Sequence, residues 1–284
     1  MQINDPSKAK DFHKLVDDHR PGNRKAALLL TGKEGTPANY RLALSEGGTA
    51  DWTAPRHRHV FEQFRYILSG DYVIGKDDVL PAGWAAYFPE SVYYGPQIKK
   101  TNMTMIILQF GGPNGLGYWS AEQFSQASAR LEAKGNGKFD NGIYTWTDAE
   151  GRRHNQDAVE AVEQEMRGSK IVYPPARYND VIRMNPASFD WVMDADSPGV
   201  ARKHLGTFTE RDVRFGFVRL EKGATLQFGA EMSPEALVLM NGTMTHDNSS
   251  YGRYTAFGTE ADESPVALTA VEPSELLYMK MPTY

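Results

Sequence analysis

The chain has 284 residues, 40% of them apolar, and a formal net charge of −5. This length allows one large domain or two small ones, and the acidic balance excludes the basic surface typical of nucleic-acid binding. No cysteine is present, which excludes disulfides, thiolate-ligated zinc, iron–sulfur clusters and thiol nucleophiles. A transition metal would need ligands from the seven histidines or from oxygen-bearing side chains. We expect a cytoplasmic protein with no membrane partner, because the first residues are polar and lack an apolar signal segment.

Short apolar segments separated by Gly, Pro, Asn and Asp predict strands along most of the chain. Residues 7–18 are predicted as a short N-terminal helix. A capping box at Ser120 and Gln123 opens a helix that ends near Gly135, and Asp157–Met166 is predicted as another helix. The predicted strands include Tyr40–Ser45, Phe64–Leu68, Ala85–Phe88, Thr104–Phe110, Val213–Leu220, Ala236–Met240 and Leu276–Met281.

The predicted elements divide the chain into three parts. Strands fill a first half over 1–115, the two internal helices form a connector over 116–170, and strands return over 171–284. Two β-rich halves around a helical connector indicate two β domains or one duplicated unit. The expected fold class is therefore all-β, built as a sandwich or a barrel.

One pair of histidines is spaced to act together, His57 and His59. In a strand, side chains two residues apart point to the same face, so both imidazoles can converge on one point. Two imidazoles and an oxygen ligand from a neighbouring strand would form a facial metal site with open positions, which suits Fe(II) and also Mn, Ni or Zn.

The residues around this pair resemble the two motifs of the cupin superfamily. The first cupin motif reads G-x5-H-x-H-x3/4-E-x6-G, and His57, His59, Gln63 and Gly70 fit its register. The second reads G-x5-P-x-G-x2-H-x3-N; Gly83, Pro89, Ser91 and Tyr94 fit it. A rival register over Gly75, Pro81 and Gly83 puts Ala86 at the ligand position and leaves little room for a hairpin.

The chain departs from the cupin pattern at two ligand positions. Gln63 stands where cupins have a carboxylate, and it offers only a neutral amide oxygen. Glu62, one residue earlier, could replace it if a bulge slipped the strand by one residue. Tyr94 stands at the fourth ligand position and would ligate only as a phenolate, far below its usual pKa. Arg65 is a candidate partner for a substrate carboxylate, and Tyr94 a candidate acid or hydrogen-bond donor.

The second half repeats the spacing in degenerate form. Gly229 and Glu231 occupy the two histidine positions, Glu235 the carboxylate position and Tyr278 the fourth ligand position. The resemblance therefore implies a bicupin, similar to an uncharacterised bacterial subgroup, with two jelly-roll barrels, of which only the first keeps its histidines.

The resemblance implies a metal-dependent enzyme acting on a small oxygenated molecule, with dioxygenase chemistry first and decarboxylation or isomerisation next. The site would use His57, His59, and Glu62 or Gln63. Two alternatives stay open: a non-catalytic bicupin that binds a small molecule, and a metal-independent isomerase or epimerase with His59 as base and Tyr94 as acid. A homodimer is also open, because exposed β edges favour strand pairing.

Overall fold

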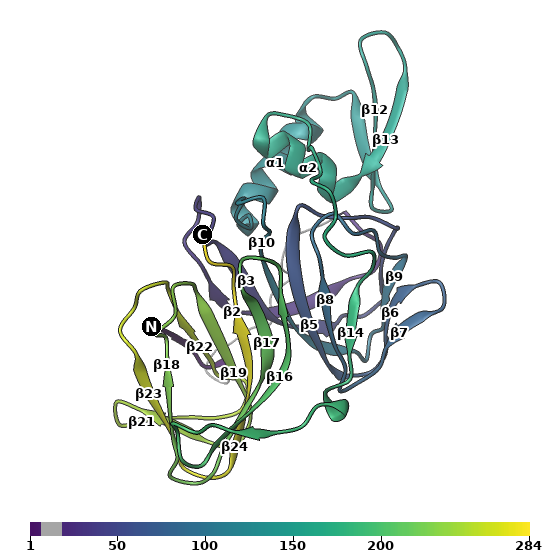
Figure 1. Ribbon diagram of the computed structural model, residues 1–284. Helices are drawn as coiled ribbons and strands as arrows, with labels where there is room; N and C mark the ends of the chain where they lie inside the picture. Colours follow the sequence, from purple (N-terminus) through teal and green to yellow (C-terminus); the bar gives the residue numbers. More distant parts are fainter. Residues whose placement is uncertain (7–18) are drawn as a thin grey trace.

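The computed structural model describes residues 1–6 and 19–284, and the helix expected over 7–18 lies outside them. Two β barrels lie side by side, and a helical connector stands over one of them (Figure 1). In the described residues no helix is long and apolar enough to cross a membrane.

The first barrel consists of a six-stranded and a four-stranded sheet. The larger sheet has the order β14-β8-β5-β10-β3-β2, and the smaller one β4-β9-β6-β7. The larger sheet consists of β2 (Arg24–Thr31), β3 (Tyr40–Gly47), β5 (Phe61–Ser69), β8 (Ala85–Phe88), β10 (Thr104–Gly111) and β14 (Ile182–Met184). The smaller sheet consists of β4 (Trp52–Ala54), β6 (Tyr72–Gly75), β7 (Asp78–Leu80) and β9 (Gln97–Lys99).

The second barrel repeats this plan with a seven-stranded and a four-stranded sheet. Their orders are β1-β22-β19-β24-β17-β16-β15 and β18-β23-β20-β21. The larger sheet consists of β1 (Gln2–Asn4), β15 (Val192–Met193), β16 (Val200–Phe208), β17 (Val213–Leu220), β19 (Glu235–Asn241), β22 (Ala256–Thr259) and β24 (Ser274–Lys280). The smaller sheet consists of β18 (Thr225–Phe228), β20 (Met244–His246), β21 (Ser249–Tyr251) and β23 (Val266–Ala270).

The two barrels exchange strands. β1, at the start of the chain, pairs with β22 of the second barrel, and β14, which follows the connector, pairs with β8 of the first. The expected boundaries at 1–115 and 171–284 therefore cut across two pairings, since each half contributes one strand to the other half's sheet.

The connector contains both predicted helices. Ser120 caps α1 (Ala121–Ala133) with the full capping box, and Asp157 caps α2 (Ala158–Arg167). The structure adds a three-stranded sheet that the sequence analysis did not predict: β11 (Gly137–Asp140), β12 (Ile143–Thr147) and β13 (Arg153–Asp157). A 3-10 turn over Pro186–Ser188 lies beyond the connector.

Side chains along each strand of the large sheets point alternately into the barrel and toward the other barrel, and this explains how the apolar residues pack. Each barrel has its own buried interior, and a third, larger cluster joins the two large sheets face to face. In β5, Phe64 belongs to that shared cluster while Ile67 belongs to the interior of the first barrel. Phe64 stacks on Phe215 of β17, with ring centroids 4.5 Å apart. The shared apolar face holds the barrels together, because burial of apolar surface drives packing of sheets.

Candidate functional site

The four side chains at the cupin ligand positions meet inside the first barrel. His57 forms an isolated β bridge with Tyr94, with reciprocal backbone hydrogen bonds of 3.0 Å. The ring centroids of His57 and His59 lie 4.9 Å apart, and those of His57 and Tyr94 lie 4.7 Å apart. The prediction placed both histidines in a regular strand. In the structure they precede β5 and lie outside any regular strand, yet their rings still meet.

His57 is held in one tautomer. Its Nδ1 lies 2.6 Å from the carbonyl oxygen of Pro55, so that nitrogen donates and Nε2 keeps its lone pair. Nε2 of His57 and Nδ1 of His59 are buried without a hydrogen-bond partner in the described residues. Burial, with Arg20 and Arg65 nearby, holds the pKa of both imidazoles well below the usual value. Both rings are therefore uncharged at neutral pH and able to accept a proton or a ligand.

A chain of hydrogen bonds fixes Arg65 beside the histidines. Gln63 donates from Nε2 to the hydroxyl of Tyr94 at 2.7 Å, and its Oε1 accepts from Nη2 of Arg65 at 2.7 Å. Nη1 of Arg65 donates to the hydroxyl of Tyr72. Arg65 is only 5% exposed and forms no ion pair with a carboxylate of the described residues. A buried, unpaired guanidinium is costly unless an anion joins it.

Glu62 is not brought to the histidines. The pairing of β5 with β8 and β10 runs without a shift from Phe61 to Ile67, so no bulge turns Glu62 inward. Its side chain lies on the opposite face of β5, near Tyr87 and Glu90, and burial raises its pKa to about 8. The expectation that Glu62 would supply the missing carboxylate is not met by this geometry.

A narrow cavity of about 40 Å³ opens in front of the imidazoles. By volume it holds about three water molecules. Four cationic side chains line it, and no carboxylate of the described residues does. The polar lining is His57, His59, Gln63, Arg65, Arg20, Arg24, Tyr72, Gln97, Lys99 and Gln109.

Several of these polar residues were not predicted from the sequence, among them Gln97 and Lys99. Gln97 is fully buried, and the oxygen and nitrogen of its side-chain amide have no hydrogen-bond partner among residues 1–6 and 19–284. Lys99, two residues on in β9, donates to Oγ of Ser45 at 2.7 Å, and burial lowers its pKa to about 7. No motif marks these positions; only an alternating Gln-x-Lys in a short strand could have indicated that both face inward.

The donor set does not fit a resident divalent cation. The described residues contain no group of three His, Asp or Glu side chains that could hold a metal. Burial raises the pKa of Tyr94, so its phenol stays protonated, and the amide oxygen of Gln63 is occupied by Arg65. Two imidazole nitrogens remain in a cationic cavity, and cations in a low-dielectric site repel a further cation.

The second barrel holds a cavity of about 270 Å³ at the corresponding place, lined by Glu235 and Tyr278 among others. Tyr278 donates to Oε1 of Glu235 at 2.5 Å, as expected from the repeated spacing. His204, the histidine that lines this cavity, is exposed and bonds to Thr207. The pair of histidines is confined to the first barrel.

Comparison with known proteins agrees with this architecture. No family model and no curated protein matches the sequence. Among solved structures, a Nostoc punctiforme protein with a provisional dioxygenase name is 9% identical, with a TM-score of 0.62 over 99% of this chain and 82% of that one. Oxalate decarboxylase from Bacillus subtilis is 13% identical, with a TM-score of 0.52 over 100% and 76%.

A provisionally named glyoxylate-induced protein from Pseudomonas aeruginosa is 10% identical, with a TM-score of 0.56 over 98% of this chain and 86% of that one. All three are bicupins. The present chain therefore has the bicupin fold: two jelly-roll barrels with a helical connector. Oxalate decarboxylase carries Mn(II) centres, so the fold accommodates divalent metals in other chains.

Proposed function

We propose that the first barrel is the active site of an enzyme that acts on a small carboxylic acid by proton transfer, without a resident metal. The observation that carries this is Arg65, which is buried and has no carboxylate partner among the described residues. A substrate carboxylate would pair with its guanidinium bidentately. Arg20 already pairs with Asp157 at 3.0 Å, so Arg65 is the better anchor.

The histidines supply the chemistry in this proposal. His57 Nε2 has a lone pair, because Nδ1 donates to Pro55, and it would take a proton from the carbon next to the bound carboxylate. Lys99, with its pKa lowered to about 7, would donate its own proton to the other face of the carbanion or to another carbon, which makes the reaction an isomerisation or epimerisation. Between turnovers His57 would release its proton to solvent and Lys99 would take one up from solvent. Acids and bases that titrate near the working pH transfer protons best, which describes Lys99; the pKa of His57 is held well below its usual value, so His57 supplies a neutral lone pair and is a weak base.

In this proposal Tyr94 is not the general acid that was expected from the sequence. Its hydroxyl accepts from Gln63, and Tyr94 does not line the cavity. We place it as a positioning residue, which holds the amide of Gln63 so that its oxygen faces Arg65. His59 lies beside His57 and remains the alternative base.

A metal-dependent, dioxygenase-type oxidoreductase is the second candidate. One observation favours it: the His57 hydrogen bond to a backbone carbonyl is also the arrangement that orients metal-bound histidines. Fe(II) would be the first metal to test.

Deuterium exchange separates the candidates. Protein purified without a His tag and treated with EDTA is incubated in D₂O with a panel of 2-hydroxy, 2-oxo and dicarboxylic acids, and loss of C–H signal is followed by NMR. Exchange that survives EDTA and is lost in His57→Gln and Arg65→Gln supports the proposal. Arg65→Lys, which keeps the charge, is the matched control.

Other outcomes favour the alternatives. Turnover with oxygen uptake that appears only after Fe(II) is added would favour the second candidate. Acid binding by calorimetry with no exchange and no turnover would indicate a binding module instead of an enzyme.

A further inference from the structure

A surface groove of about 350 Å³ adjoins the buried cavity of the first barrel. One wall is the loop around Thr36 between β2 and β3, and the other is formed by helices α1 and α2. Tyr118 and Trp119 line both the groove and the cavity. These two rings are therefore the partition between the open surface and the site at His57.

The groove carries the same electrostatic character as the cavity. Arg130 and Arg167 line it, and no Asp or Glu of the described part of the chain does. Arg130 also forms an ion pair of 3.5 Å with Glu165, which lies outside the lining. The chain has 36 acidic and 31 basic residues. An average patch of its surface would therefore include carboxylates, whereas the linings of the groove and the cavity contain arginine and lysine but no carboxylate of the described residues. A path from Arg130 and Arg167 to Arg65 offers an anion cationic partners at both ends.

A hydrogen bond and a ring stack hold Trp119 in the partition. Trp119 donates from Nε1 to Oε1 of Glu163 on α2 at 2.8 Å, and its ring stacks on that of Tyr118 at 4.5 Å. Trp119 is only half-buried. α2 also supplies Val159 to the lining of the cavity, so the connector closes the barrel mouth beside the partition.

From the shared lining we infer that the groove is the entrance for the acidic substrate, and that Trp119 sets the length of the acid that the cavity admits. This inference rests on the proposed function, since it needs an anion that binds at Arg65. Arg130 and Arg167 attract the anion, Trp119 separates it from the groove once bound, and a longer acid would need the indole to be absent.

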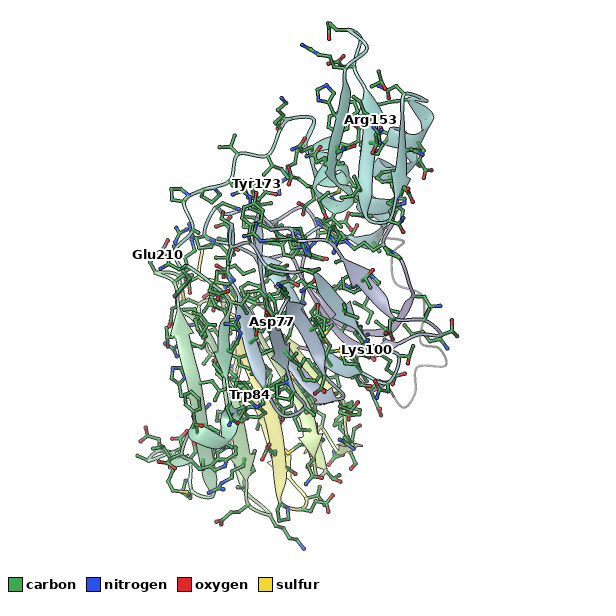
Figure 2. The ribbon with its side chains drawn as sticks, turned by 90° about the vertical axis from the view of Figure 1, so that its right-hand side faces the viewer. Asp77, Trp84, Lys100, Arg153, Tyr173 and Glu210 are labelled. Carbon is green, nitrogen blue, oxygen red and sulfur yellow. The ribbon has the colours of Figure 1, made fainter. Side chains whose placement is uncertain are left out.

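Binding kinetics of malonate test the entrance. Tryptophan fluorescence in a stopped-flow instrument reports binding, since Trp52 and Trp119 line the cavity. We expect Arg130→Gln with Arg167→Gln to lower the association rate constant about tenfold at low salt, with little change at high salt or in dissociation. Lys138→Gln with Arg153→Gln is the matched control; it removes the same charge from exposed positions on β11 and β13 of the connector, where Figure 2 shows Arg153 away from the barrels.

Benzylmalonate, a longer acid, tests the partition. Trp119→Ala should strengthen benzylmalonate binding at least about tenfold relative to malonate, as expected when a site gains room for an apolar group. Trp119→Phe removes the bond to Glu163 but keeps a ring, and should leave the exclusion in place. Circular dichroism checks that the variants fold.

The results separate this inference from the proposed function. If Arg65→Gln abolishes malonate binding while the arginine pair leaves the association rate unchanged, the entrance is elsewhere. If folded Trp119→Ala still excludes benzylmalonate, Trp119 does not set the length. If wild-type protein binds no malonate, or Arg65→Gln binds it normally, Arg65 does not form an anion site. The proposed function and the inference about the entrance are then both wrong.

Discussion

Gln63 donates a hydrogen bond to the hydroxyl of Tyr94 at 2.7 Å, at the two positions where the cupin motifs place a carboxylate and a histidine. The second barrel has the same pairing, with Glu235 accepting from Tyr278. In both barrels the tyrosine hydroxyl therefore forms a hydrogen bond with the side chain at the carboxylate position.

The first prediction concerns recovery of a metal site. Gln63→Glu with Tyr94→His would return the full set of three histidines and one carboxylate around His57 and His59. We expect the double variant to bind Mn(II) or Fe(II) at about one ion per chain after dialysis, measured by plasma mass spectrometry, because a carboxylate supplies the missing negative charge. Wild-type protein should retain about none.

The control for this variant is the same pair of changes combined with His57→Ala, which should lose the ion. A wild-type chain that keeps a stoichiometric metal lost on His57→Ala would overturn the view that the donor set does not fit a resident metal.

The spacing of the motifs predicted the bicupin fold and the meeting of His57, His59, Gln63 and Tyr94, since motif spacing reflects strand and loop lengths within each barrel. It could not predict which way Glu62 points, because that depends on whether a bulge shifts β5 by one residue. The cationic lining was also missed, since Arg20, Arg24 and Lys99 belong to different segments that only the closed barrel brings together.

The exchange of β1 and β14 was missed for a related reason. Each is a strand of three residues, too short to show a period, and its partner lies in the other half of the chain. Local sequence carries no information on such a pairing, whereas the capping box at Ser120 is local and was predicted. The helix predicted over Asp157–Met166 differs from α2 by one residue at each end, because Asp157 is its cap.

The second prediction concerns the pH dependence of acid binding. Lys99 is charged below its pKa of about 7 and neutral above it, so anion binding in the cavity should weaken as pH rises from about 6 to 8. Lys99→Met should remove this dependence while weakening binding at pH 6. Malonate calorimetry across this range is the measurement, and Lys100→Met, on an exposed neighbour, is the control; equal pH profiles for wild type and Lys99→Met would contradict the assignment.

The third prediction concerns Glu62 and the pH dependence of stability. Burial raises its pKa from 4.5 to about 8, so between these values the folded chain holds a proton that the unfolded chain has released. Its contribution therefore makes unfolding easier as pH rises through this range, by at most about 1.4 kcal/mol per pH unit.

Glu62→Gln should remove that contribution and be more stable than wild type at pH 8, while differing little at pH 4.5. Urea unfolding at a series of pH values gives the measurement. Glu90 is also buried, and its pKa is raised to about 7, so part of the slope should survive in the single variant. An unchanged slope would mean that Glu62 is ionised in the folded protein.

The fourth prediction concerns the joint between the barrels. Phe215 of β17 stacks on Phe64 of β5, and both rings are fully buried in the cluster shared by the two large sheets. Phe215→Ala should lower the free energy of unfolding by about 3–5 kcal/mol, the usual range for a buried phenylalanine. Phe257, buried inside the second barrel alone, is the matched comparison.

The two alanine variants should differ in how the chain unfolds. Loss of Phe215 weakens contacts between the barrels as well as within one. Spectroscopic probes placed in each barrel should then report two different unfolding midpoints, where wild-type protein gives one. Phe257→Ala should lower stability with one coincident transition or destabilise the second barrel first. If Phe215→Ala melts in a single transition with less than about 1 kcal/mol lost, the shared cluster does not hold the barrels together, because burial on this scale contributes more than that wherever the packing is tight.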